Sequence, residues 1–131
     1  MNAELENKLY EKYPTLFADK DRSPRESCMA FGLECGDGWY AILEELCARI
    51  ANREQNLKLN KREYTPVKFD QIKEKFGGLR VYYSGGDDYI AGAVALAEDM
   101  SYRTCERCGH PGEPSKTGWI MTLCAACQEK R

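Results

Sequence analysis

Two pairs of cysteines near the carboxyl end are the residues best suited to chemistry. Cys105 and Cys108 form one CxxC pair, Cys124 and Cys127 form another, and 15 residues separate the two pairs. Each CxxC can form a tight turn that points both thiolates at one position, and two such turns complete the tetrahedral four-sulfur shell that zinc favours. Four protein ligands leave no coordination position for water. The spacing therefore predicts one structural Zn²⁺ ion.

Two disulfides, or four unrelated buried thiols, are the alternatives to a metal site. The chain has seven cysteines, an odd number, and its first residues lack the apolar stretch of a secretory signal. We therefore expect a reducing, cytoplasmic setting, in which structural disulfides are disfavoured. His110, the sole histidine, is a competing ligand, but the four-thiolate shell is complete without it.

The segment between and after the cysteine pairs predicts a small module. Gly109 suits the left-handed turn after the first pair, and residues 119–123 can form the strand that leads to the second. Only four residues follow Cys127, so a helix after the second pair would be truncated at best. We expect a zinc-ribbon-like module of two knuckles.

The rest of the chain must supply the elements that hold this module. Apolar spacing predicts a short helix over residues 3–13, an irregular connection over 14–27, and a helix from about 38 to 52 that Asp37 could cap. A further helix is expected over about 88–103, because Asp87 and Asp88 fit its capped start. Its apolar side is formed by Tyr89, Ala93, Leu96 and Met100, widened by Ile90, Val94 and Ala97. The small residues 91–93 would allow another element to approach closely.

Residues 66–84 predict a β-hairpin with Gly77 and Gly78 as its two-residue loop. In that register Lys75 lies opposite Arg80, and a bulge near residues 70–71 brings Val67 and Phe69 to the apolar face. The other face is basic and is a candidate surface for a protein partner or for nucleic acid; it carries Lys73, Lys75, Arg80 and Tyr82.

Together these elements predict an α+β fold, with two main helices on one face of a small antiparallel sheet and the zinc module docked at its end. The expected organisation is residues 1–27 as N-terminal helix and connection, 28–103 as the α+β core, and 104–131 as the zinc-binding module, within one compact domain. No apolar run approaches the ~18 residues of a membrane span.

A small cysteine-dependent enzyme centred on Glu34, Cys35 and Asp37 is one functional hypothesis. The base that such a nucleophile needs is missing, and neighbouring carboxylates raise a thiol pKa. The simpler interpretation is that Cys28, Cys35 and Cys47 are small buried hydrophobic residues. The sequence thus favours a protein that is not an enzyme.

The formal charge of −2 does not indicate a general nucleic-acid binder. Residues 53–83 nevertheless carry eight basic and four acidic side chains. The basic hairpin face could be an ordinary solvated surface, a site for an acidic protein, or a site for nucleic acid, whose binding surfaces interleave aromatic rings with cations.

Three segments, LECGDGW, KEKFGGLRVYYSGGDD and CERCGHPG with GWIMTLCAAC, resemble a group of small uncharacterised bacteriophage and prophage proteins. The resemblance covers residues 33–127 and implies a bacterial cytoplasmic setting, a zinc-stabilised tail and no catalytic residue. It makes an interaction protein that modulates or inhibits a host protein, such as a defence complex, the leading hypothesis. A nucleic-acid-binding accessory factor that uses the basic face and the zinc module is the alternative.

Overall fold

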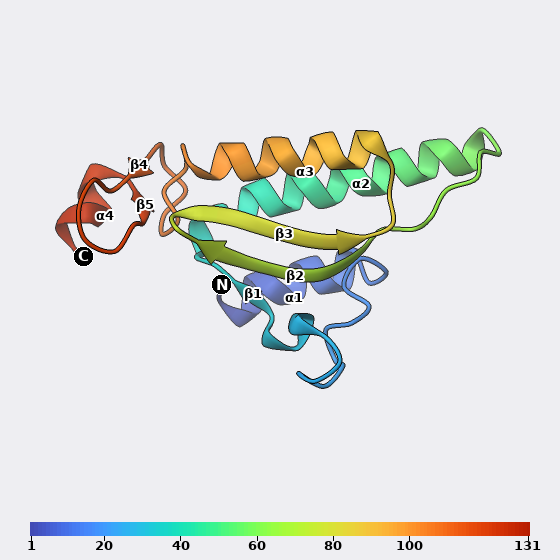
Figure 1. Ribbon diagram of the computed structural model, residues 1–131, viewed down its shortest axis with the longest axis horizontal. Coiled ribbons are helices and arrows are strands. Elements are labelled where there is room, and N and C mark those ends of the chain that lie inside the picture. The colour runs from blue at the N-terminus through green and yellow to red at the C-terminus, as the bar shows by residue number, and fades with distance from the viewer.

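A computed structural model describes residues 1–131 and shows a mixed three-stranded sheet with long helices along it and a small cysteine-containing module at one end (Figure 1). The helices are α1 (Ala3–Lys12), α2 (Tyr40–Leu59), α3 (Asp88–Ser101) and α4 (Ala125–Glu129), with 3₁₀ turns η1 (Cys28–Phe31) and η2 (Asp37–Trp39). The strands are β1 (Leu33–Glu34), β2 (Lys68–Lys75), β3 (Gly78–Ser84), β4 (Glu113–Pro114) and β5 (Thr122–Leu123). No helix is long and apolar enough to span a membrane.

The expected α+β class is confirmed, and the sheet has the order β1-β2-β3. β2 and β3 form the predicted antiparallel hairpin, while the two-residue strand β1 pairs with β2 in parallel, so the sheet is mixed. The outer edge of β3 is protected by α3: Ser101 Oγ accepts a hydrogen bond from Leu79 N, and Glu98 Oε2 accepts one from Val81 N, both at 2.9 Å. These bonds leave fewer free edge groups for another chain to pair with.

The predicted hairpin register is wrong by two residues. Phe76 and Gly77 form the turn, with φ angles of 54° and 81°, and Lys75 pairs with Gly78. Gly78 lies inside β3 because the Tyr102 ring packs on it: a Cβ there would lie 2.3 Å from the ring. A two-residue slip keeps the paired side chains on their expected faces. Phe76 is the exception, because it was expected on the apolar face opposite Leu79 but lies in the turn and is exposed. The predicted bulge is confirmed between Phe69 and Gln71.

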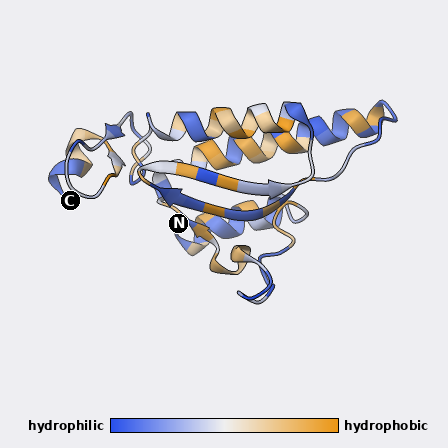
Figure 2. Cartoon of the chain, in the orientation of Figure 1, coloured by the Kyte–Doolittle hydropathy of each residue, from blue (hydrophilic) through white to orange (hydrophobic).

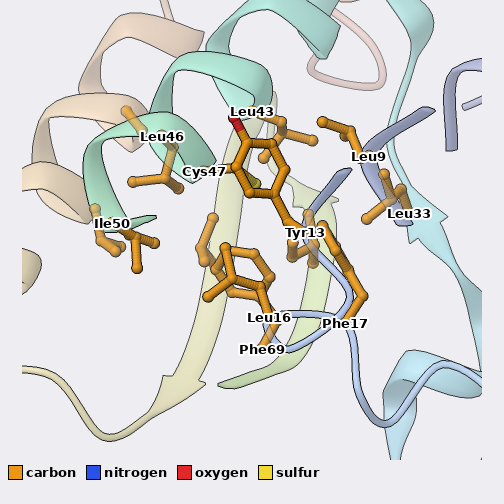
Figure 3. Packing of buried hydrophobic residues seen from close by; sticks show 14 of the residues in the cluster. Leu9, Tyr13, Leu16, Phe17, Leu33, Leu43, Leu46, Cys47, Ile50 and Phe69 are labelled. Carbon is orange, nitrogen blue, oxygen red and sulfur yellow. The ribbon is translucent and has the colours of Figure 1, made fainter. Parts of the chain in front are cut away.

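The core forms where α2, the segment around residue 16 and the sheet meet. Trp39, Leu43, Leu46 and Ile50 from the predicted stripe are buried, with Cys47 beside them. The rings of Phe17 and Phe69 lie 5.0 Å apart, and Figure 3 shows Leu9 and Leu16 in the same cluster. The N-terminal segment thus contributes core residues, although its sequence predicted only an accessory helix and a connection.

Helix capping agrees with the sequence at one site and not at another. Asp87 caps α3 by accepting a hydrogen bond from Ile90 N at 3.1 Å, as predicted. Asp37 was expected to cap the helix that follows it, but its carboxylate instead accepts bonds from the backbone N–H and side-chain amide of Asn2. Asp37 therefore ties the N-terminus of the chain to η2.

Candidate metal centre

Four cysteine sulfurs gather at the carboxyl end of the molecule. The Sγ atoms of Cys105, Cys108, Cys124 and Cys127 all lie within 4.8 Å of one another, and the Cys108 and Cys124 sulfurs are 3.6 Å apart. Four thiolates held 2.3 Å from a central zinc have S–S distances of about 3.8 Å in a regular tetrahedron. The donor set and its spacing therefore fit one four-coordinate metal ion.

Short local elements place the four sulfurs. The first pair forms a turn closed by Gly109 N donating to Cys105 O at 2.9 Å, and Gly109 has the positive φ predicted for it. Cys124 is the N-cap residue of α4, and Cys127 lies in its first turn. The second pair thus lies at the start of a five-residue helix, where the sequence predicted a second knuckle.

The pKa values of the cluster thiols are shifted in opposite directions: that of Cys105 is lowered and that of Cys127 is raised. Burial raises the pKa of Cys105, but N–H groups of Cys124, Cys108 and Arg107 outweigh it and lower the pKa to about 6. The pKa of Cys127 is raised to about 12, chiefly by a hydrogen bond between its thiol and the Cys124 side chain. Like charges this close disfavour one another, so all four sulfurs can ionise together only beside a cation.

His110 lies outside the four-sulfur cluster. Its Nδ1 is 3.3 Å from Cys108 Sγ, and no fifth ligand belongs to the group. The group of four sulfurs is complete without His110, which contacts one of its members.

The module is anchored to the sheet end by Glu106. Its carbonyl accepts a 2.7 Å hydrogen bond from Gly38 N, and its Oε2 accepts a 2.9 Å bond from Gly36 N. Glu106 is almost completely buried, and this burial raises the pKa of its carboxyl. On the other side, Thr122 Oγ1 donates a 2.6 Å hydrogen bond to Gly77 O in the hairpin turn. Figure 1 shows this turn pointing at the module.

The four residues of the predicted basic face lie on one side of the hairpin. Lys73 pairs directly with Arg80, so the predicted pairing of Lys75 with Arg80 is wrong. Arg80 donates a 3.1 Å hydrogen bond to the Tyr102 hydroxyl, a bond that raises the Arg80 pKa. Tyr82 is 45% exposed. On the opposite edge of β2, Glu34 of the parallel strand β1 lies in register with Lys73, so one carboxylate adjoins this face.

The structure does not activate Cys35. Burial, together with the carboxylates of Glu106 and Glu6, raises the pKa of its thiol to about 12, although the N-terminal ammonium acts in the opposite direction. Cys47 is likewise buried, with a pKa raised to about 12 by its burial. A protonated thiol is a poor nucleophile, so this region offers no activated cysteine. Cys28 is exposed, which corrects the expectation that it is a buried hydrophobic residue.

An apolar groove between α2 and α3 was not predicted. Ile90, Val94 and Ala97 of α3 are buried, whereas Tyr89, Leu96 and Met100, which were placed on the same core-facing side, are exposed. With α2 they line an open groove of about 770 Å³. A Cβ placed on Gly92 would have no neighbour within 4 Å, so Gly92 itself has open space beside it, whereas Ala93 next to it packs against the core.

The signal for this groove was present in the sequence. The apolar stripe of α3 is wider than one core-facing row needs, and it extends onto the side away from the sheet. Figure 2 shows apolar residues along much of both helices. A helix that is apolar over more than its core face needs a second contact surface.

Comparisons with known proteins give no relative: no protein-family model, no curated protein and no solved structure matches this chain. The resemblance to phage and prophage proteins stays a prediction.

Proposed function

We propose that this protein is a zinc-stabilised, non-enzymatic interaction protein of a phage or prophage. In the cytoplasm of the bacterial host it binds a host protein, such as a component of a defence complex, and modulates or inhibits it. The phage setting comes from the resemblance of residues 33–127. The observation that carries the binding role is the open apolar groove between α2 and α3.

The metal in this proposal is zinc and its role is structural. Four sulfur ligands are the set that structural zinc sites use, and a closed shell has no position for a substrate or a water. The cluster holds together residues 104–131, a segment with few core residues. This segment contacts the rest of the protein through Glu106, which bonds to Gly36, and Thr122, which bonds to Gly77. The zinc ion thus fixes the surface of the protein and takes no part in chemistry.

The groove fits the side chains of a partner helix. Its walls are two helices, and its apolar residues repeat at three- and four-residue intervals, as in Leu96 and Met100 on α3 and Ile42 and Leu46 on α2. Leu96 is 64% exposed and Met100 is 44% exposed. An amphipathic helix laid into such a groove buries its apolar face against both walls. Exposed apolar surface of this kind marks an interaction site.

The polar residues of the groove carry both signs of charge. Arg49 and Glu45 form an ion pair on α2, with 3.4 Å between Nε and Oε1, and Asp88 lies at the start of α3. The groove therefore gives affinity through its apolar floor and orientation through its charged rim.

The test is affinity purification from phage-infected bacteria with three forms of the protein. The wild type and Leu59→Glu should retain the same host protein, and Leu96→Glu should lose it. Leu59 is the matched control because it is 71% exposed on α2 and lies outside the groove. Retention of the same protein by Leu96→Glu, or no retained protein in any sample, would contradict the proposal.

A further inference from the structure

An exposed phenylalanine occupies an unfavourable backbone position at the tip of the hairpin. Phe76 has a φ of 54°, a conformation that two-residue turns usually fill with Asn, Asp or Gly. Its ring is 67% exposed. Phe76 thus lowers the stability of the fold through its backbone conformation and also exposes apolar surface to water. Strain of this kind in an exposed position is typical of a ligand contact.

The exposed apolar surface continues from the hairpin tip onto the cysteine module. A Cβ on Gly77 would lie 3.0 Å from Ile120 Cγ2, so the β4–β5 loop touches the turn directly. Ile120 is 40% exposed, and Trp119 before it is 76% exposed. Phe76 in the turn and Trp119, the residue before Ile120, thus add exposed rings to the two segments that meet at the junction between sheet and module.

Cations adjoin these rings on the sheet side. Lys75 Nζ lies 5.6 Å from the centroid of the Phe76 ring, and Lys73 pairs with Arg80 on the same strand face. None of the three cations forms an ion pair, since every salt bridge of the chain involves other residues. The nearest carboxylate on the tip, Glu74, is occupied by Gly77 N at 2.7 Å.

We propose that this surface, made of Phe76, Trp119, Tyr82, Lys73, Lys75 and Arg80, binds single-stranded nucleic acid. Unpaired bases stack on exposed rings while phosphates contact neighbouring cations. Each stacked base adds binding free energy whatever its identity, because every base has an aromatic face. The exposed rings and the cations together match the bases and phosphates of a single strand, and an acidic protein is the alternative occupant that the competition experiment below tests. The net charge of −2 over the whole chain confines attraction for phosphate to this basic surface. The site is separate from the α2–α3 groove.

The two tryptophans allow a direct test. Trp39 is fully buried and Trp119 is 76% exposed, so a fluorescence change on binding reports Trp119. A fluorescein-labelled 20-nucleotide oligothymidylate should bind the zinc-loaded protein at low salt, with quenching of Trp119 emission in a parallel titration of the unlabelled oligomer. Binding should weaken as salt rises, because phosphate contacts release counterions.

Three variants separate this site from the rest of the molecule. Phe76→Asn should weaken binding at least tenfold while leaving the melting temperature unchanged or higher, because Asn tolerates the positive φ. Lys73→Ala/Lys75→Ala/Arg80→Ala should weaken binding and flatten its salt dependence. The charge-matched control Arg25→Ala/Lys58→Ala/Arg62→Ala, and the groove variant Leu96→Glu, should bind like the wild type.

Three results would overturn the proposal. The first is no binding of the oligothymidylate at low salt. The second is binding that Phe76→Asn leaves intact, which would show attraction of charge alone. The third is equal competition by polyglutamate without a change in Trp119 fluorescence, which would identify a surface for acidic proteins.

Discussion

Gly38 lies against the carbonyl oxygen of Cys105, so close that a Cβ on Gly38 would be 2.1 Å from that oxygen. The Gly38 N–H donates a hydrogen bond to the next carbonyl, that of Glu106. The turn of the first CxxC pair and the start of η2 thus lie in direct backbone contact, and any side chain at residue 38 must push the cysteine module away from η2.

Substitution of this glycine should therefore loosen the module. We expect Gly38→Ala to lower the free energy of unfolding by about 1–3 kcal/mol, the usual cost of overpacking. Gly92→Ala is the matched control: it lies within α3 with open space around it, and we expect a gain of about 0.5–1 kcal/mol. Urea unfolding of both variants measures the difference, and equal stability of the two would refute the contact.

Removal of a cluster sulfur should release the metal. The purified wild type should hold one zinc ion per chain, and Cys108→Ser should hold much less and melt at a lower temperature. Structural zinc binding contributes roughly 10 kcal/mol in small peptides, so a chelator should have the same effect on the wild type. Cys28→Ser, an exposed cysteine outside the cluster, should keep its metal. Metal analysis and thermal melting decide the matter; a metal-free wild type would contradict the zinc assignment.

Thiol reactivity should follow burial. In the zinc-loaded protein at pH 8, an alkylating reagent should modify Cys28 first, because Cys35 and Cys47 are buried with pKa values raised to about 12 by that burial. All seven cysteines should react after denaturation in the presence of a chelator. Mass spectrometry of timed samples identifies the sites. Rapid alkylation of Cys35 in the native protein would reopen the hypothesis of a cysteine-dependent enzyme.

Acid should remove the contribution of the α3 cap. The N–H of Ile90 and then the guanidinium of Arg53 lower the pKa of Asp87, so its stabilising effect is complete above the ordinary carboxyl pKa and is lost as pH falls through the lowered value. Asp87→Asn keeps an acceptor for Ile90 but loses the charge that faces Arg53. We expect it to cost about 0.5–1 kcal/mol at pH 7. Unfolding at pH 7 and near pH 2.5 tests this, and a cost independent of pH would be the contrary result.

The hairpin illustrates what sequence reasoning could and could not predict. Alternating apolar residues and the Gly-Gly pair identified the two strands, the bulge and the basic face. Whether Gly78 or Phe76 joins Gly77 in the turn depended on Tyr102, which lies more than twenty residues away in the chain and packs on Gly78. Local pattern cannot reveal such a contact, so the register was wrong while the faces were right.

The sequence by itself determined the elements whose cause is local. Each CxxC spacing brings two sulfurs together because the turn is a short-range structure, and the apolar stripe of α2 selects its buried face. Tertiary structure alone decided how these parts meet: Glu106 anchors the cysteine module to Gly36 and Gly38, and the outer stripe of α3 stays open to solvent. These outcomes depend on packing between distant segments, where the space left by one element fixes the position of the next.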